Sequence, residues 1–195
     1  MANVLFISEQ YLKDTSYIDE NVDIKLIRSN ILETQDFRIL SILGSTLYDD
    51  LKSKISAATL SNDEKTLLNT YIAPALKYWV LHDGAYLFQF KIMNKAIVKR
   101  SSENAQPVET TDLDRLMDYF KGRAEFYSER ITRFLIANNT TYPLYYNYGS
   151  GLDVVIPKMN NFTQGLYLGK SRRYSGIEVD KGIQNYTPND FDTNA

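Results

Sequence analysis

The feature that most constrains the fold is an apolar stretch from Leu67 to Val98, which has few polar interruptions. Read as a helix, the stretch carries apolar and aromatic residues on more than one face. Such a helix is stable only where other helices or other subunits surround it. Pro74 is expected to kink this central helix, because proline lacks a backbone donor and clashes with the preceding turn.

Shorter helices are predicted on the N-terminal side of the central helix. Ser8 can cap a helix over residues 9–13, and apolar residues three and four apart predict a longer helix over 21–43. Gly44 follows it at the C′ position, where glycine is favoured. Ser45 can then cap a helix whose apolar stripe contains Leu47, Leu51 and Ile55.

Capping signals also mark the central helix and the last one. Ser61 and Glu64 have the spacing of a capping box, and so do Thr111 and Asp114. The last helix is predicted to end before Asn138, and its seam alternates four and three apart through Leu113, Met117, Phe120, Ala124, Tyr127, Ile131 and Phe134. Between the two helices, residues 94–110 are predicted to form a short strand or a projecting loop.

Composition changes near residue 138. The residues beyond it hold six of the nine glycines, three of the five prolines and seven of the fifteen tyrosines. The sequence therefore predicts a mainly α protein: a bundle of about four to five helices over residues 1–138, with a kinked central helix and a projecting loop. Residues 139–195 are predicted to form a long, largely irregular C-terminal arm.

The arm is rich in aromatic residues and poor in charge, unlike most disordered tails. Tyrosine is favoured at interfaces because it buries a large area and keeps a polar tip. We expect the arm to dock on neighbouring molecules; folding back on its own core and disorder are the alternatives. The residues expected to bind a partner are Tyr142, Tyr145, Tyr146, Tyr148, Phe162, Tyr167 and Tyr174.

The charge pattern argues against a nucleic-acid-binding domain. The chain has 22 basic and 24 acidic residues and a net charge of −2, so it lacks a strong basic field. One basic cluster, Lys170, Arg172 and Arg173, could contact an acidic protein surface or phosphate, or lie in a solvated loop. The absence of cysteine, of a signal peptide and of a long apolar span predicts a soluble intracellular protein without a membrane anchor.

Residues that could support catalysis are scarce. The only histidine, His82, lies beside Asp83 in the central helix, where adjacent side chains are expected to point about 100° apart. A structural histidine is the favoured interpretation. Asp112, Asp114 and Asp118 suit a helix N-terminus better than a metal site. We therefore expect no enzyme activity, no catalytic or metal-binding residue and no cofactor.

The order of these signals resembles the head-to-tail connector, or adaptor, proteins of tailed bacteriophages. The matching pieces are the opening 6–13, the helix from Asn21, the turn at 42–48, the central helix around 71–75, and 93–98 followed by a polar loop and a long helix. The composition, which lacks cysteine and is rich in Asn and Tyr, also resembles that of crAss-like phage proteins.

This resemblance implies a structural virion protein of the phage neck. About twelve copies would form a ring that joins the portal protein to the tail or neck proteins and surrounds genomic DNA without sequence-specific binding. The protein would be assembled in the host cytoplasm and reside at the head–tail interface. The length of the arm departs from the family pattern. The alternative is a small helical regulatory or ligand-binding module, with the arm folded over a pocket beside Trp79 and His82.

Overall fold

The computed structural model describes residues 3–92, 94–99, 109–149 and 153–159. Every described residue belongs to one compact unit, Met1–Asn160. The described part is mainly α-helical and has one short hairpin. The predicted fold class is therefore confirmed, whereas the arm beyond residue 159 lies outside the described residues.

Two short helices open the fold. Helix α1 spans Glu9–Thr15, and the Ser8 hydroxyl oxygen accepts the N–H of Tyr11 at 3.1 Å, as the predicted cap requires. Helix α2 spans Ile24–Thr34. It begins later than predicted because Asp23 is its cap, with the side chain accepting a backbone N–H at 2.9 Å.

The predicted helix over 21–43 changes its hydrogen-bonding pattern on the way. After α2 it continues as a π-helical segment, η1 (Gln35–Ile39), and then as α3 (Leu40–Leu43). Gly44 follows with φ +76°, a conformation that glycine adopts at little cost. It ends this series of helices as predicted.

The central helix contains a second π-helical segment. It consists of α5 (Asn62–Thr66), η2 (Leu67–Ile72) and α6 (Ala73–Gln89). The Ser61–Glu64 capping box is present, with both of its hydrogen bonds. The π-helical turn comes directly before Pro74, so the α-helical pattern is interrupted where proline would clash with an α-helical turn.

Helix α6 ends before the apolar stretch does. Strands β1 (Phe90–Ile92) and β2 (Ile97–Lys99) pair antiparallel, with Phe90 opposite Lys99. The prediction of helix over Phe90–Ile92 was wrong, because a short apolar run suits a strand as well as a helix. The short strand predicted within 94–110 is present as β2. The expected projecting loop begins with this hairpin, and its residues 100–108 lie outside the described residues.

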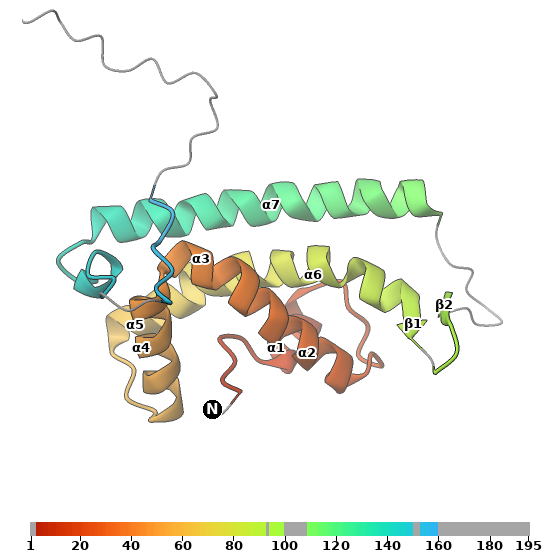
Figure 1. The fold of residues 1–195 in the computed structure, drawn as a ribbon, viewed down its shortest axis with the longest axis horizontal. Helices are drawn as coiled ribbons and strands as arrows, with labels where there is room; N and C mark the ends of the chain where they lie inside the picture. The colour runs from red at the N-terminus through yellow and green to blue at the C-terminus, as the bar shows by residue number, and fades with distance from the viewer. Residues whose placement is uncertain (1–2, 93, 100–108, 150–152, 160–195) are drawn as a thin grey trace, which may run out of the picture. The chain divides into compact units, whose positions relative to one another are not determined.

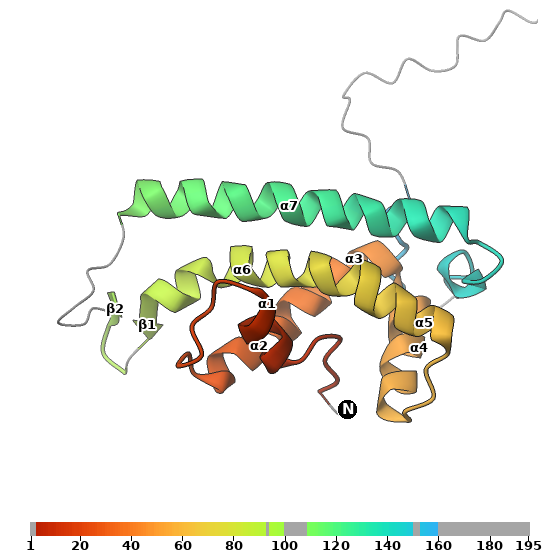
Figure 2. The same ribbon diagram turned by 180° about the vertical axis from the view of Figure 1, so that it is seen from behind.

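Helix α7 spans Thr110–Ala137 and lies along α6 (Figures 1 and 2). The Trp79 indole N–H of α6 donates to the Ser128 hydroxyl of α7 at 2.8 Å. The predicted seam is largely buried, but the helix begins at Thr110 after Glu109, without a side-chain cap. The capping box predicted at Thr111 is therefore absent.

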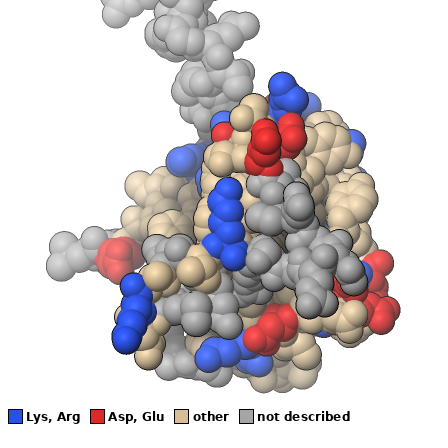
Figure 3. Space-filling model, turned by 90° about the vertical axis from the view of Figure 1, so that its right-hand side faces the viewer, with Lys and Arg blue, Asp and Glu red and all other residues tan. Residues whose placement is uncertain are grey.

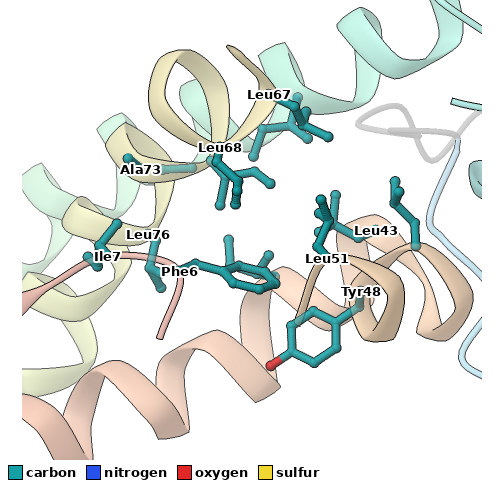
Figure 4. Packing of buried hydrophobic residues seen from close by; sticks show 14 of the residues in the cluster. Phe6, Ile7, Leu43, Tyr48, Leu51, Leu67, Leu68, Ala73 and Leu76 are labelled. Carbon is teal, nitrogen blue, oxygen red and sulfur yellow. The ribbon is translucent and has the colours of Figure 1, made fainter. Parts of the chain in front are cut away.

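The core lies where the N-terminus, α4 (Ser45–Ser56) and the central helix meet. Figure 4 shows Phe6 among side chains of these elements, with its ring 5.1 Å from the Tyr48 ring. The buried Gln35 amide connects them, since it accepts the Phe6 N–H at 2.8 Å and donates to the Tyr48 hydroxyl at 3.0 Å. Leu47 and Leu51 are buried here, as their spacing predicts.

The first part of the predicted arm also belongs to this core. Tyr142 and Tyr145 are buried in it. Further on, the Ser45 N–H donates to the Val155 carbonyl at 3.0 Å, and the Ser45 hydroxyl accepts the Val155 N–H at 2.9 Å. Ser45 thus binds the returning chain and does not cap α4. The compact unit extends to Asn160, beyond the predicted boundary at residue 138.

Candidate functional site: two flanks beside the central helix

The residues predicted to bind a partner have different positions in the structure. Tyr142 and Tyr145 are inside the core, so their assignment to a partner surface was wrong. The Tyr142 hydroxyl donates to the Asp63 carbonyl at 2.8 Å, and burial raises the pKa of Tyr145 to about 12. Tyr146 is 36% exposed, and Tyr148 is partly buried.

The other predicted contact residues lie outside the described residues. They are Phe162, Tyr167, Tyr174, Lys170, Arg172 and Arg173. Their part in binding a partner, an acidic surface or phosphate stays a prediction.

A polar cluster connects α6 to η1 around the only histidine. The Arg38 guanidinium donates to both Asp83 carboxylate oxygens, at 3.0 and 2.7 Å, and stacks over the Trp79 ring at 4.2 Å. His82 Nδ1 lies 2.7 Å from Asp83 Oδ1. The expectation that His82 and Asp83 point apart was wrong, because their side chains turn toward each other at the edge of the helix.

The electrostatics of this cluster favour the charged carboxylate. Burial raises the pKa of Asp83, but hydrogen bonds from Arg38 and His82 outweigh it and hold that pKa below its ordinary value. The hydrogen bond to Asp83 correspondingly raises the pKa of Arg38. A carboxylate stabilised in this way is a weak proton acceptor. Asp83 is therefore better suited to hold α6 and η1 together than to act as a general base.

Beside this cluster, α2, η1 and α6 enclose a hollow of about 460 Å³. Its lining comprises Asn30, Glu33, Thr34, Phe37, Arg38, Asp83, Tyr86 and Leu87. Phe37 at its rim is 72% exposed, although it is apolar. We call the surface formed by Glu33, Phe37, Tyr86 and Leu87 the η1 flank.

A second, larger hollow of about 850 Å³ lies between the loop after α1, α6 and α7. Its lining is mainly apolar and includes Tyr17, Leu81, Phe88, Leu113, Leu116 and Phe120. Tyr17 is 77% exposed while its ring stacks on Phe120 at 6.3 Å. Together with the adjoining stripe of α7, this surface is the α1 flank; its outer residues are Tyr17, Leu116, Tyr119, Arg123, Phe126 and Arg130.

The α7 stripe of this flank alternates aromatic and basic residues. Tyr119, Arg123, Phe126 and Arg130 follow one another four, three and four apart, so they share one side of the helix. The Arg123 guanidinium lies over the Tyr119 ring at 4.3 Å and the Arg130 guanidinium over the Tyr71 ring at 4.9 Å. Among the described residues, neither arginine has a carboxylate partner within salt-bridge distance.

The two flanks lie on opposite sides of α6. At ~100° per residue, Leu81, Ala85 and Phe88, which line the larger hollow, point away from Asp83, Tyr86 and Leu87, which line the smaller one. Figure 1 has α2 and α3 in front of α6, and Figure 2, from behind, has α1 in front. The compact unit therefore presents two unlike surfaces on opposite sides.

Two of the aspartates near the start of α7 contact nearby side chains. Among the described residues, no group of three or more His, Asp or Glu side chains is placed to hold a metal ion. Asp114 accepts the Tyr86 hydroxyl at 2.7 Å, and Asp112 lies 3.4 Å from Arg115. On the end of the molecule seen in Figure 3, basic and acidic side chains are interspersed.

Two aromatic residues of α7 could have indicated the α1 flank from the sequence, although they do not follow the heptad pattern. The heptad pattern of α7 shows which residues face α6, but Tyr119 and Phe126 are large aromatics outside that seam. Aromatic residues on the outer side of an amphipathic helix are a surface signal. The η1 flank had no comparable signal, because Phe37 follows the helical spacing of core residues.

Comparison with known proteins places the chain in a family. The sequence pattern of DUF6712, described as a family of unknown function, matches residues 39–152, which is more than half of the 195 residues. The chain belongs to the DUF6712 family. In this DUF6712 protein the matched region runs from the end of η1 through α7 to the buried tyrosines. It includes most of the outer residues of the α1 flank, and it includes Tyr86 and Leu87 but not Glu33 and Phe37 of the η1 flank. Comparisons with curated proteins and with solved structures gave no match.

Among the described residues, no helix is both long enough and apolar enough to cross a bilayer.

Proposed function

We propose that this protein is a structural component of a bacteriophage neck, in which about twelve copies form a ring. The ring would join the portal protein to the tail or neck proteins and enclose the DNA channel without sequence-specific contacts. The protein would act in the virion after assembly in the host cytoplasm. The order of elements that resembles phage connector proteins supports this proposal.

The observation that carries the proposal is the pair of exposed aromatic surfaces on opposite sides of α6. Phe37 on one flank, and Tyr17 and Phe126 on the other, are each more than half exposed. Isolated exposed apolar residues are ordinary, but aromatic clusters at the rims of hollows are typical of interaction sites. A molecule with a binding surface on each side can contact two neighbours at once, which a closed ring requires.

The proposal is tested with the portal protein encoded by the same genome. Sedimentation velocity of the mixed proteins should show a complex that contains several copies of this chain per portal. The chain with Phe37→Ser and Phe126→Ser should lose the multi-copy complex, because both flanks lose their exposed aromatic ring. Absence of any complex between the wild-type chain and the portal would count against the proposal.

A second candidate is the small ligand-binding module. The observation that favours it is the hollow of about 460 Å³, where the paired Arg38 and Asp83 lie beside apolar Leu87. A small ligand there should raise the melting temperature of the isolated chain, as a binder of the folded state must. The same ligand should have no effect on the chain with Leu87→Trp, which fills the hollow.

A further inference from the structure

We propose that copies of this protein assemble head to tail, with the α1 flank of one copy against the η1 flank of the next. This inference rests on the proposed ring and names the surfaces that would form it. The occupant of each flank is a second copy of the chain. The two flanks differ in shape and in charge, so the contact is heterologous rather than two-fold symmetric.

The basic residues of the α1 flank support a contact with a second copy. The α1 flank carries Arg123 and Arg130, and Lys77 lies beside them with its ammonium 4.8 Å from the Tyr78 ring centre. The hollow there also has Asp19 and Asp23, but both carboxylates accept local backbone N–H groups, at 3.3 and 2.9 Å. Asp19 and Asp23 lie in the loop after α1, so the stripe of α7 is the basic part of this flank.

The opposite side of the molecule carries the complementary charge. Glu33 lines the η1 flank. Arg38 lines the same hollow, and the nearby Glu125 of α7 contributes to the raised pKa of Arg38. Arg38 itself is neutralised by Asp83 at 2.7 Å.

The shapes of the two flanks also support this contact. Phe37 projects from η1 with 72% of its surface exposed, and it has an acidic neighbour in Glu33. The α1 flank offers the larger, mainly apolar hollow of about 850 Å³, and Arg123 and Arg130 lie on the adjoining stripe of α7. An apolar projection flanked by carboxylates suits an apolar hollow flanked by cations, because both the ring and the charges find partners.

A second copy is favoured over DNA as the occupant of the α1 flank. Phosphate would pair with Arg123 and Arg130, but it would leave the apolar rim at Tyr17, Leu116 and Phe126 uncovered. A protein surface with an aromatic anchor covers both. DNA binding by this flank is therefore an outcome that the test must exclude.

Charge reversal with cross-complementation tests the head-to-tail contact. One variant has Arg123→Glu and Arg130→Glu, and the other has Glu33→Lys and Glu125→Lys; all four side chains are exposed, so folding should be unaffected. Each variant alone should associate at least about tenfold more weakly than the wild type, because like charges then meet. Mixed in equal amounts, the two should assemble again, since every contact in an alternating ring regains opposite charges.

The double variant Lys65→Glu and Lys95→Glu makes the same change in net charge as the Arg123→Glu, Arg130→Glu variant. Its sites are exposed and line neither hollow, so it should assemble like the wild type. The inference would be overturned if either flank variant assembled normally, if the mixed variants did not associate again, or if the wild type stayed monomeric. Duplex DNA that binds the wild type but not the Arg123→Glu, Arg130→Glu variant would assign this flank to DNA instead.

This experiment can fail independently of the proposed function. Assembly through the flanks without portal binding would refute the neck role and leave the head-to-tail contact standing. Portal binding by the wild type, together with normal assembly of both flank variants, would refute the head-to-tail contact and leave the neck role standing.

Discussion

At the scale of single residues, the side chains that organise this fold are polar and partly or fully buried. Gln35 joins the N-terminus to α4, Asn30 donates to the Val80 carbonyl at 2.9 Å, and Asp83 holds Arg38. Each connects segments that are distant in sequence. Their residue types are ordinary in a sequence, and their roles depend on which groups the fold brings beside them.

Asp83→Asn should destabilise the protein in a pH-dependent way. The folded pKa of Asp83 is lower than its unfolded value, so its stabilisation is complete above the ordinary carboxyl pKa of ~4. The stabilisation is lost as pH falls through the folded pKa. The variant should lose about 1.5–3 kcal/mol of unfolding free energy at pH 7, and the difference from wild type should shrink below about pH 4.

Urea unfolding at several pH values measures this difference. Asp118→Asn, at an exposed position without a salt bridge among the described residues, is the matched control and should change stability little. A deficit for Asp83→Asn that persists unchanged into acid would show that charge pairing with Arg38 is not its cause.

At the scale of helices and strands, the sequence correctly predicted features that depend on residues close together in the chain. The Ser61–Glu64 capping box and the end of a helix at Gly44 depend on neighbours in sequence, and both were predicted correctly. The change from helix to strand at Phe90 was not, since an apolar run of that length satisfies either structure. The burial of Tyr145 was missed because composition cannot distinguish a core tyrosine from an interface tyrosine.

The packing of α6 against α2 predicts opposite effects for two glycine substitutions. A Cβ at Gly84 would lie 2.1 Å from the Asn30 side-chain nitrogen, whereas a Cβ at Gly122 in α7 would meet no atom within 4 Å. Gly84→Ala should therefore lower the unfolding free energy by about 1–3 kcal/mol. Gly122→Ala should raise it by about 0.5–1 kcal/mol through helix propensity.

Thermal and urea unfolding of the two variants checks the sign of each effect. Both glycines are inside helices, so propensity contributes equally and the difference reports the contact with Asn30. A stabilising Gly84→Ala would contradict the close approach of α2 and α6.

At the scale of the whole molecule, the boundary of the folded unit decides how the C-terminal residues should be regarded. A chain that ends at Asn160 keeps Tyr142, Tyr145 and the Ser45–Val155 contact, so it should unfold at the wild-type urea concentration. A chain that ends at Asn138 loses two buried tyrosines, each worth about 3–5 kcal/mol by analogy with large core truncations. It should be unfolded or strongly destabilised.

Circular dichroism of the two truncated chains gives the comparison. Equal stability of both would show that residues 139–159 are not part of the core.

In the proposed ring, the compact unit contacts a neighbour on each side and the copies surround a channel. Cryo-electron microscopy of the full chain mixed with the portal protein of the same genome tests it most directly. We expect a closed ring on the portal, with Phe37 of each copy facing the hollow beside Tyr17 of the next. Isolated copies on the portal, a two-fold dimer, or flanks turned to solvent would contradict it.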